Sequence, residues 1–172
     1  LSSKFSVFIS PADEKVDKAD LFSKNSFQEG IEKIFINCGE TTVEQMTMKS
    51  NEKRFKGFSH ILTIHDTFGK NCLPRIAAKI PESVLITDVL SIEESEKGNF
   101  LQFERPIYAG NAIAKVEILS KTAPQLISIR STAFSKDENV KVVDNIEVEN
   151  NKCEATKLSN ILKRVIAKSR RP

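Results

Sequence analysis

The sequence has few of the residues on which disulfide, metal and nucleophile sites are built. It contains 3 cysteines, 2 histidines and 6 glycines in 172 residues. Because the cysteines are odd in number and widely spaced, a disulfide scaffold or a zinc site is not expected, and reduced intracellular thiols are. The glycines are all isolated, so the chain has no GxGxxG fingerprint, Walker loop or nucleophile elbow. These absences remove the commonest signatures of a self-contained enzyme.

Long hydrophobic runs and a strong charge bias are missing as well. Lysine and arginine total 26 and aspartate and glutamate 23, a formal net charge of +3 that is too small to predict binding to nucleic acid. No apolar stretch approaches the roughly 18 to 20 residues that cross a bilayer, so no membrane span is expected. The balance of 40% hydrophobic and 28% charged residues is ordinary for a globular domain.

The first half of the chain alternates predicted strands with predicted helices. Short apolar runs predict strands at Lys4–Ser10, Ile31–Cys38 and His60–His65. Polar segments with periodic apolar residues predict helices at Asp13–Ser23, Thr41–Gly57 and Cys72–Ile80. This alternation predicts parallel strand pairing in an α/β layer fold.

Two helix ends carry specific expectations. Thr41 and Glu44 have the spacing of a capping box at the start of the second helix. Pro74 is tolerated in the third helix only if it lies in the first turn, where its missing N–H costs nothing.

In the second half of the chain, predicted strands no longer alternate with predicted helices. Four extended runs follow with no helix between them, at Val84–Ile92, Leu101–Tyr108, Ile113–Leu119 and Leu126–Phe134. Charged and apolar residues alternate along the third run, which predicts strands that are at least partly antiparallel. The polar sequence of residues 135–151 predicts a loop with at most one edge strand. The expected organisation is a domain over residues 1–151, followed by an amphipathic helix and the start of a linker over residues 152–172.

Four site hypotheses each have a plain structural alternative. His60 or His65 with Asp66 and Cys72 could form a hydrolytic set, or each could be a capping, surface or buried residue; Cys38 is a buried strand residue or a nucleophile.

The TFGKN loop could bind an anion through Gly69, Lys70 and the following helix, or Asn71 or Thr67 could simply cap that helix. The basic residues of the C-terminal helix could meet a membrane or nucleic acid, or form a solvated face. The sequence therefore predicts no catalytic, cofactor-binding or metal-ligating residue.

Several strings resemble the electron-transfer flavoprotein α subunit family. Phe68–Glu94 contains FGKNCLPRIAAK and ITDV, and Phe103–Glu117 contains RPIYAGNA, the most specific of these strings. Ile127–Phe134 (ISIRSTAF) is similar to the family's next strand, and KSRRP at 168–172 resembles the string that opens its flavin-binding domain.

The resemblance implies the Rossmann-like, adenine-nucleotide α-hydrolase-like N-terminal domain of that family. Such a domain has a mostly parallel sheet with helices on both faces and some antiparallel strands. Leu1–Ser10 aligns with the family's second strand, so the first strand and helix are expected to be missing. The family's flavin is held by a C-terminal domain, and its AMP by the β subunit. FAD is thus expected in the full-length protein, and no cofactor in this fragment.

The resemblance also implies a function. The family's heterodimer is an electron carrier, not an enzyme: it accepts electrons from flavin dehydrogenases, such as the acyl-CoA dehydrogenases of fatty-acid β-oxidation, and passes them to a quinone reductase. The mitochondrial matrix is expected if the source is eukaryotic, and the cytoplasm if it is bacterial.

Within that resemblance, this domain is a scaffold and a contact surface for the β subunit, with Arg105, Tyr108 and Asn111 as structural or interface positions. Gly110 and Asn111 are expected to accept a positive φ where the strand pauses. The alternative from another class is a free-standing adenine-nucleotide-binding module that uses the Gly69–Lys70 loop.

Overall fold

The structure is a computed structural model that describes residues 5–9, 31–38, 42–49, 58–95, 100–119, 124–135, 147–152 and 162. It divides into two compact units, residues 1–45 with 142–172 and residues 46–141, and each is described by itself. The predicted helix at 13–23 and the basic C-terminal helix, apart from Leu162, lie outside the described residues.

The first unit contains a three-stranded parallel sheet. Its strands are β1 (Phe5–Ile9), β2 (Ile31–Cys38) and β9 (Glu147–Lys152), in the order β1-β2-β9. Both pairings are parallel. The first two predicted strands are confirmed. For residues 135–151 at most one edge strand is predicted, and β9 is an edge strand that begins at Glu147.

Helix α2 (Val43–Lys49) begins with a capping box that is shifted by one residue from the predicted one. The backbone N–H of Thr42 donates to Oε1 of Gln45 (2.8 Å), and the N–H of Gln45 donates to Oγ1 of Thr42 (3.3 Å). The predicted pair Thr41 and Glu44 is therefore wrong. Both pairs have the required spacing, but the helix starts at Val43, which makes Thr42 the N-cap.

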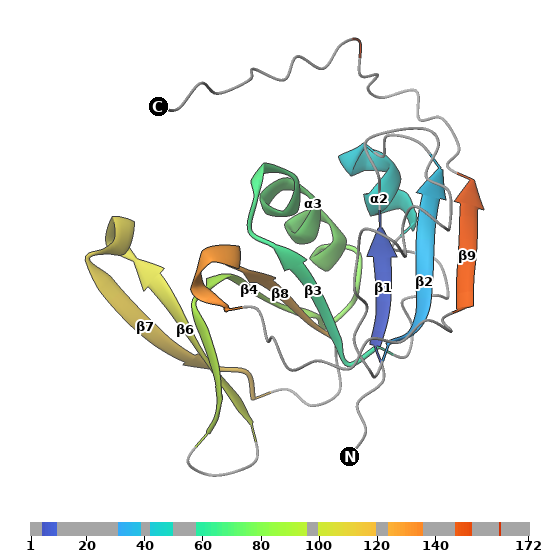
Figure 1. The fold of residues 1–172 in the computed structure, drawn as a ribbon. Coiled ribbons are helices and arrows are strands. Elements are labelled where there is room, and N and C mark those ends of the chain that lie inside the picture. Colours follow the sequence, from blue (N-terminus) through green and yellow to red (C-terminus); the bar gives the residue numbers. More distant parts are fainter. Residues whose placement is uncertain are drawn as a thin grey trace, which may run out of the picture. The chain divides into compact units, whose positions relative to one another are not determined.

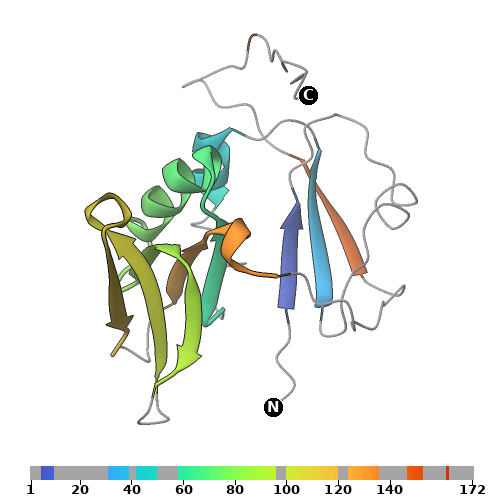
Figure 2. The ribbon, with the colours of Figure 1, turned by 60° about the vertical axis from the view of Figure 1, so that its left-hand side comes forward.

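The second unit combines a parallel and an antiparallel sheet (Figures 1 and 2). The parallel sheet has the order β3-β8-β4, with β3 (His60–Ile64), β8 (Gln125–Ile129) and β4 (Val84–Val89). The antiparallel sheet has the order β5-β6-β7, with β5 (Ser91–Glu94), β6 (Leu101–Ile107) and β7 (Ala112–Glu117). The predicted α/β class, with parallel and some antiparallel pairing, is confirmed.

The predicted run Val84–Ile92 is not one strand. The chain leaves the parallel sheet after Val89, whose carbonyl accepts from Arg130 N–H (2.9 Å), and joins the antiparallel sheet at Leu90, whose N–H donates to the Glu104 carbonyl (2.8 Å). The apolar pattern continues through this transfer because both sheets bury the same core. A hydrophobic run alone could not show the change of partner. The last predicted run also ends early, because Ser131–Ala133 form the short 3-10 turn η3.

The core of the second unit lies between these two sheets. Its buried residues come from β4, β6, β8 and the residue after β7, and they are Ile86, Val89, Phe103, Ile118 and Ile127. Phe103 and Val89 are fully buried. The hairpin of β6 and β7 thus covers one face of the parallel sheet.

Helix α3 (Thr67–Ala77) packs against β3, β4 and β8. It buries a stripe at the spacing of one helix face, made of Gly69, Cys72, Leu73 and Ile76. Gly69 lies against Ile64 and Thr63, and Thr63 is the register partner of Ser128. The helix therefore covers the face of the sheet to which Ser128 belongs.

The start of α3 corrects two predictions. The TFGKN segment is helix rather than loop, because Asp66 is the N-cap and its Oδ1 accepts from Gly69 N–H (2.7 Å). Pro74 consequently lies inside the helix and not in its first turn. The Asp66 cap fixes the start of the helix seven residues before this proline, and the tertiary packing of the buried stripe outweighs the local preference against proline.

No helix among the described residues is long and apolar enough to cross a membrane.

Candidate functional site

A β-bulge at the carboxyl end of the parallel sheet sets up the first candidate site. Ile86 pairs with Ile127 and Val89 pairs with Ile129, so two residues of β4, Thr87 and Asp88, oppose Ser128 alone. Asp88 has a left-handed backbone (φ 62°), which Asp tolerates better than most residues. Its N–H donates to Oγ of Ser128 (3.1 Å). The side chain of Ser128 therefore supplies the acceptor that an unbulged ladder would provide.

His65 completes this hydrogen-bonded end. It follows β3 directly, its N–H donates to the Ile129 carbonyl (2.8 Å), and its Nδ1 lies 2.8 Å from Oγ of Ser128. Ser128 is 1% exposed and its oxygen already accepts from Asp88 N–H, so its hydroxyl proton is assigned to Nδ1 of His65. In neutral His65 the ring proton then sits on Nε2, which faces Oδ1 of Asp88 at 3.8 Å.

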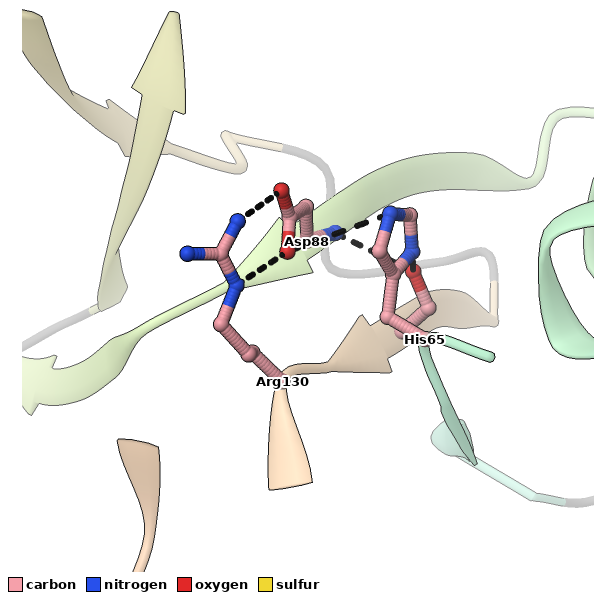
Figure 3. A network of polar contacts seen from close by, with 4 residues as sticks. His65, Asp88 and Arg130 are labelled. Carbon is pink, nitrogen blue, oxygen red and sulfur yellow. Dashed lines mark hydrogen bonds and ion pairs between the residues drawn. The ribbon is translucent and has the colours of Figure 1, made fainter. Parts of the chain in front are cut away.

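Asp88 is held from its other side by Arg130, the residue after β8. Arg130 donates from Nε to Oδ1 (2.9 Å) and from Nη2 to Oδ2 (2.6 Å), a bidentate pair. Figure 3 shows the carboxylate of Asp88 between the guanidinium of Arg130 and the ring of His65. The hydrogen bonds from Arg130 lower the pKa of Asp88 below its ordinary value, against the opposing effect of burial. The same contact raises the pKa of Arg130.

The electrostatics of His65 favour its neutral form. Burial, the largest cause, lowers the pKa of His65 below its ordinary value of 6.5. Asp88 acts in the opposite direction, while the positive charges of Lys70, Arg130 and Arg105 lower the pKa further. A carboxylate next to a histidine usually raises its pKa, and Asp88 does so here, but burial and the three positive charges outweigh it.

Ser128, His65 and Asp88 are the residue types of a hydrolytic triad, but their arrangement does not fit one. Ser128 is buried, so its Oγ cannot reach a substrate, and it contacts Nδ1 while the carboxylate faces Nε2. The 3.8 Å between Nε2 and Oδ1 is too long for a direct hydrogen bond. What the arrangement can do is tie together the ends of three strands, β3, β4 and β8. We call His65, Asp88, Ser128 and Arg130 the strand-end network.

The Asp88–Arg130 pair makes the free energy of unfolding depend on pH in the acidic range. The folded-state pKa of Asp88 lies below the unfolded value of about 3.8, so the unfolded chain binds more protons in that window. Its contribution is present above about pH 3.8 and is lost as the pH falls through the folded-state pKa. Asp88→Asn is expected to flatten the acid limb of the unfolding free energy measured by urea titration below pH 4. A matched control is Glu94→Gln on β5; a slope unchanged by Asp88→Asn would contradict the assignment.

The second candidate site is the turn of the RPIYAGNA hairpin, between β6 and β7. Three consecutive residues of the 3-10 turn η2 (Tyr108–Gly110) have a positive φ of 50°, 54° and 91°. Asn111 closes the turn, because its N–H (3.2 Å) and Nδ2 (2.8 Å) both donate to the Tyr108 carbonyl. Tyr108 is 78% exposed, so a defined backbone presents one large aromatic side chain to its surroundings.

The structure corrects part of what was expected of this turn. Gly110 has the predicted positive φ, but Asn111 is right-handed (φ −74°), and Tyr108 and Ala109 take the left-handed positions instead. The reason is that the two hydrogen bonds from Asn111 need it after the turn and not inside it. Arg105 lies on β6 opposite Ala114, with its Nε buried and without a hydrogen-bond partner.

The remaining predicted candidates are not brought together into one site. Cys72 is 4% exposed in the packed face of α3, which fits the buried interpretation, and Asp66 is committed to capping that helix. His60 contacts Oγ of Ser59 (2.9 Å) at the opposite end of β3 from His65.

Cys38 ends β2, and nothing is described of its side chain. Among the residues that the structure describes, no three histidine, cysteine or acidic side chains form a metal-binding group.

The segment considered as a possible anion-binding loop at Gly69 and Lys70 is not a loop. Both residues are helical, and the carboxylate of Asp66 already occupies the Gly69 N–H. A Cβ on Gly69 would overlap the Ile64 carbonyl, so this glycine permits a close approach of helix and strand. For the same reasons the start of α3 does not fit the pyrophosphate of a dinucleotide such as FAD.

Sequence reasoning missed Asp88, Ser128 and Arg130 as a group. Two signals were available: an aspartate inside an apolar strand is unusual, and Ser128 on β8 and Arg130 directly after it alternate with isoleucines. Neither signal reveals the bulge that turns Asp88 toward Arg130.

The protein is an α/β domain in which polar residues hold the ends of three strands and one exposed turn. Comparison with known proteins agrees with the α/β class. The electron transfer flavoprotein domain family matches residues 41–161, which is more than half of the chain. The chain belongs to this family.

Individual relatives match a shorter segment. A probable mitochondrial electron transfer flavoprotein subunit alpha of Cryptococcus neoformans is 41% identical over 81 residues, covering 47% of this chain and 22% of that protein. The mitochondrial subunit alpha of Arabidopsis thaliana is 48% identical over 77 residues (45% and 19%). The subunit alpha of Pseudomonas aeruginosa is 40% identical over 79 residues (46% and 23%). The matched segment is thus about a fifth of each relative.

Proposed function

We propose that this chain is the N-terminal, flavin-free domain of an electron transfer flavoprotein α subunit and serves as a scaffold and subunit contact. The turn of the RPIYAGNA hairpin carries the proposal. Its backbone is set by Asn111 and by three left-handed residues, and it exposes Tyr108. Aromatic side chains of this kind are frequent anchors at protein interfaces. The expected partner is the β subunit.

In this proposal the chain does no redox chemistry itself and is not an enzyme. FAD belongs to the full-length protein, outside this fragment, and no residue here is assigned to it. The full heterodimer accepts electrons from flavin dehydrogenases, such as those of fatty-acid β-oxidation, and passes them to a quinone reductase. The proposed division is a domain over residues 1–151 and a helix with the start of a linker over 152–172. The names of two eukaryotic relatives include the word mitochondrial, which supports a mitochondrial place in a eukaryote; for a bacterial source the proposed place is the cytoplasm.

Tyr108→Ala tests the contact. The variant is expected to weaken binding of the chain to the β subunit about tenfold or more, as the loss of a central aromatic anchor does. Tyr108 is 78% exposed, so the variant should fold as the parent does. Binding is measured by calorimetry with purified β subunit from the same organism.

Leu119→Ala is the matched control, because Leu119 is 73% exposed and lies outside the turn. No binding of the parent chain would contradict the proposed partner, and equal binding by the Tyr108 variant would contradict the turn as the contact. A visible flavin spectrum in the purified chain would contradict its flavin-free role.

A further inference from the structure

His65 sits between two hydrogen-bonding groups that respond oppositely to a proton. Its Nδ1 accepts from the buried hydroxyl of Ser128 at 2.8 Å, and its Nε2 faces the carboxylate of Asp88 at 3.8 Å. The ring therefore touches both parts of the bulge, the serine that holds the Asp88 backbone and the carboxylate that holds Arg130.

Protonation of His65 would reverse its contact with Ser128. Nδ1 becomes a donor, so Oγ of Ser128 must accept from it as well as from Asp88 N–H. The Ser128 proton then loses the acceptor that the neutral ring provides. Since Ser128 is 1% exposed, water cannot replace that acceptor without the bulge opening. The hydroxyl of Ser128 therefore has a partner for its proton, and the bulge stays closed, only while His65 is neutral.

Protonation of His65 also changes how strongly His65 and Arg130 each attract the carboxylate of Asp88. In the neutral state each carboxylate oxygen accepts one hydrogen bond from Arg130, and Nε2 of His65 stays beyond hydrogen-bond distance of Oδ1. Because the carboxylate lies between the guanidinium and the imidazole ring (Figure 3), a movement toward Nε2 lengthens its contacts with Arg130. A charged imidazolium at that position attracts the carboxylate as the guanidinium does. Arg130 is the more exposed partner, with 45% of its side chain accessible against 16% for His65, so it can leave the pair and be hydrated.

We propose that His65 is a proton-operated latch on the strand-end network. Neutral His65 keeps the bulge closed and Arg130 paired. Protonated His65 leaves the hydroxyl proton of Ser128 without its acceptor, draws Asp88 toward Nε2 and frees the guanidinium of Arg130 at the carboxyl end of the sheet. The inference uses only this network and does not depend on the proposed subunit contact.

The charges around His65 determine the pH range in which the latch opens. Asp88 on β4 favours the charged ring, whereas Lys70 on α3, Arg130 after β8 and Arg105 on β6 oppose it. Burial opposes it too and is the largest influence, so the pKa of His65 lies below 6.5. The latch is accordingly closed at neutral pH and opens in a more acidic range.

The latch is tested by NMR titration of the full 172-residue chain from pH 7.5 to 4.5. Three signals report on it: the ring of His65, the backbone amide of Asp88 and the Nε–H of Arg130. All three are expected to shift with one common midpoint below pH 6.5. The Arg130 signal is also expected to lose its protection from solvent exchange at least tenfold across that midpoint. Constant Asp88 and Arg130 signals while the His65 ring titrates would overturn the proposal, as would unfolding of the chain before His65 titrates.

Two variants separate the latch from general acid effects. His65→Asn places an amide where Nδ1 lies but does not titrate in this range, so the shifts of Asp88 and Arg130 are expected to vanish. His60→Asn removes the other histidine, whose ring contacts Ser59, and is expected to leave them unchanged. If His65→Asn fails to fold, the titration of the parent protein still decides. Persistence of the shifts in a folded His65→Asn variant would also overturn the proposal.

Discussion

Gly69→Ala is expected to lower the free energy of unfolding by about 3 kcal/mol, although the same change inside a helix normally stabilises by about 1 kcal/mol. The reason is the close approach of α3 to β3. The new Cβ would overlap the Ile64 carbonyl oxygen and lie 3.2 Å from Cγ2 of Thr63. Backbone atoms cannot rotate away, so helix and strand must separate. Thermal unfolding followed by circular dichroism should show a Tm lower by roughly 6 to 12 °C.

Gly110→Ala is the control for this substitution. Gly110 has a φ of 91° and no atom within 4 Å of a built Cβ, so its replacement introduces backbone strain without overlap. That strain costs about 1 to 2 kcal/mol. A loss for Gly69→Ala equal to or smaller than that for Gly110→Ala would contradict the packing described for α3.

Phe103→Ala is expected to cost about 3 to 5 kcal/mol, the usual range for a fully buried phenylalanine. Phe103 has no exposed surface and lies between the parallel sheet and the β6–β7 hairpin, in contact with residues of both. Its loss leaves a cavity that neither rigid sheet can close. Urea unfolding monitored by circular dichroism would give the change in free energy directly.

Phe134→Ala makes the same chemical change at a site that is 38% exposed and outside the core cluster. It is expected to cost about 1 kcal/mol, because less apolar area returns to water and no closed cavity remains. Similar losses for the two variants would mean that the hairpin does not share a core with the parallel sheet.

The sequence predicted the strands well because their signal is local. The bounds of β2 match the predicted Ile31–Cys38, and β3, β6 and β7 lie within a residue or two of their predicted runs. Burial alternates along β7 as far as Val116, with Lys115 exposed between two less exposed residues. Glu117 departs from the alternation, because it is only partly exposed and accepts from Ser95 and Gln102. A strand's apolar run and its period of two are properties of a few consecutive residues.

The errors concern residues whose role depends on distant partners. The sequence predicts a continuous strand through Leu90, because hydrophobicity does not show that the chain exchanges β8 for β6 there. Asp88 and Arg130 are 42 residues apart, and only the bulge opposite Ser128 brings them together. The start of α3 was missed because Asp66 was considered as a catalytic partner and not as a cap. Local propensity therefore located elements, while tertiary pairing determined the site.

The strand order also has a consequence for the synthesis of the chain. Among the strands that the structure describes, β3 and β4 do not bond to each other, and each pairs with β8, which lies between them. A ribosome therefore releases both strands, with their apolar faces, before Gln125–Ile129 exists to join them. In the first unit β9 likewise arrives last. Such non-local parallel pairing slows folding and prolongs the exposure of unpaired edges. A nascent chain that stops before residue 125 has β3 and β4 but cannot complete this sheet, and it should depend on chaperones until β8 emerges.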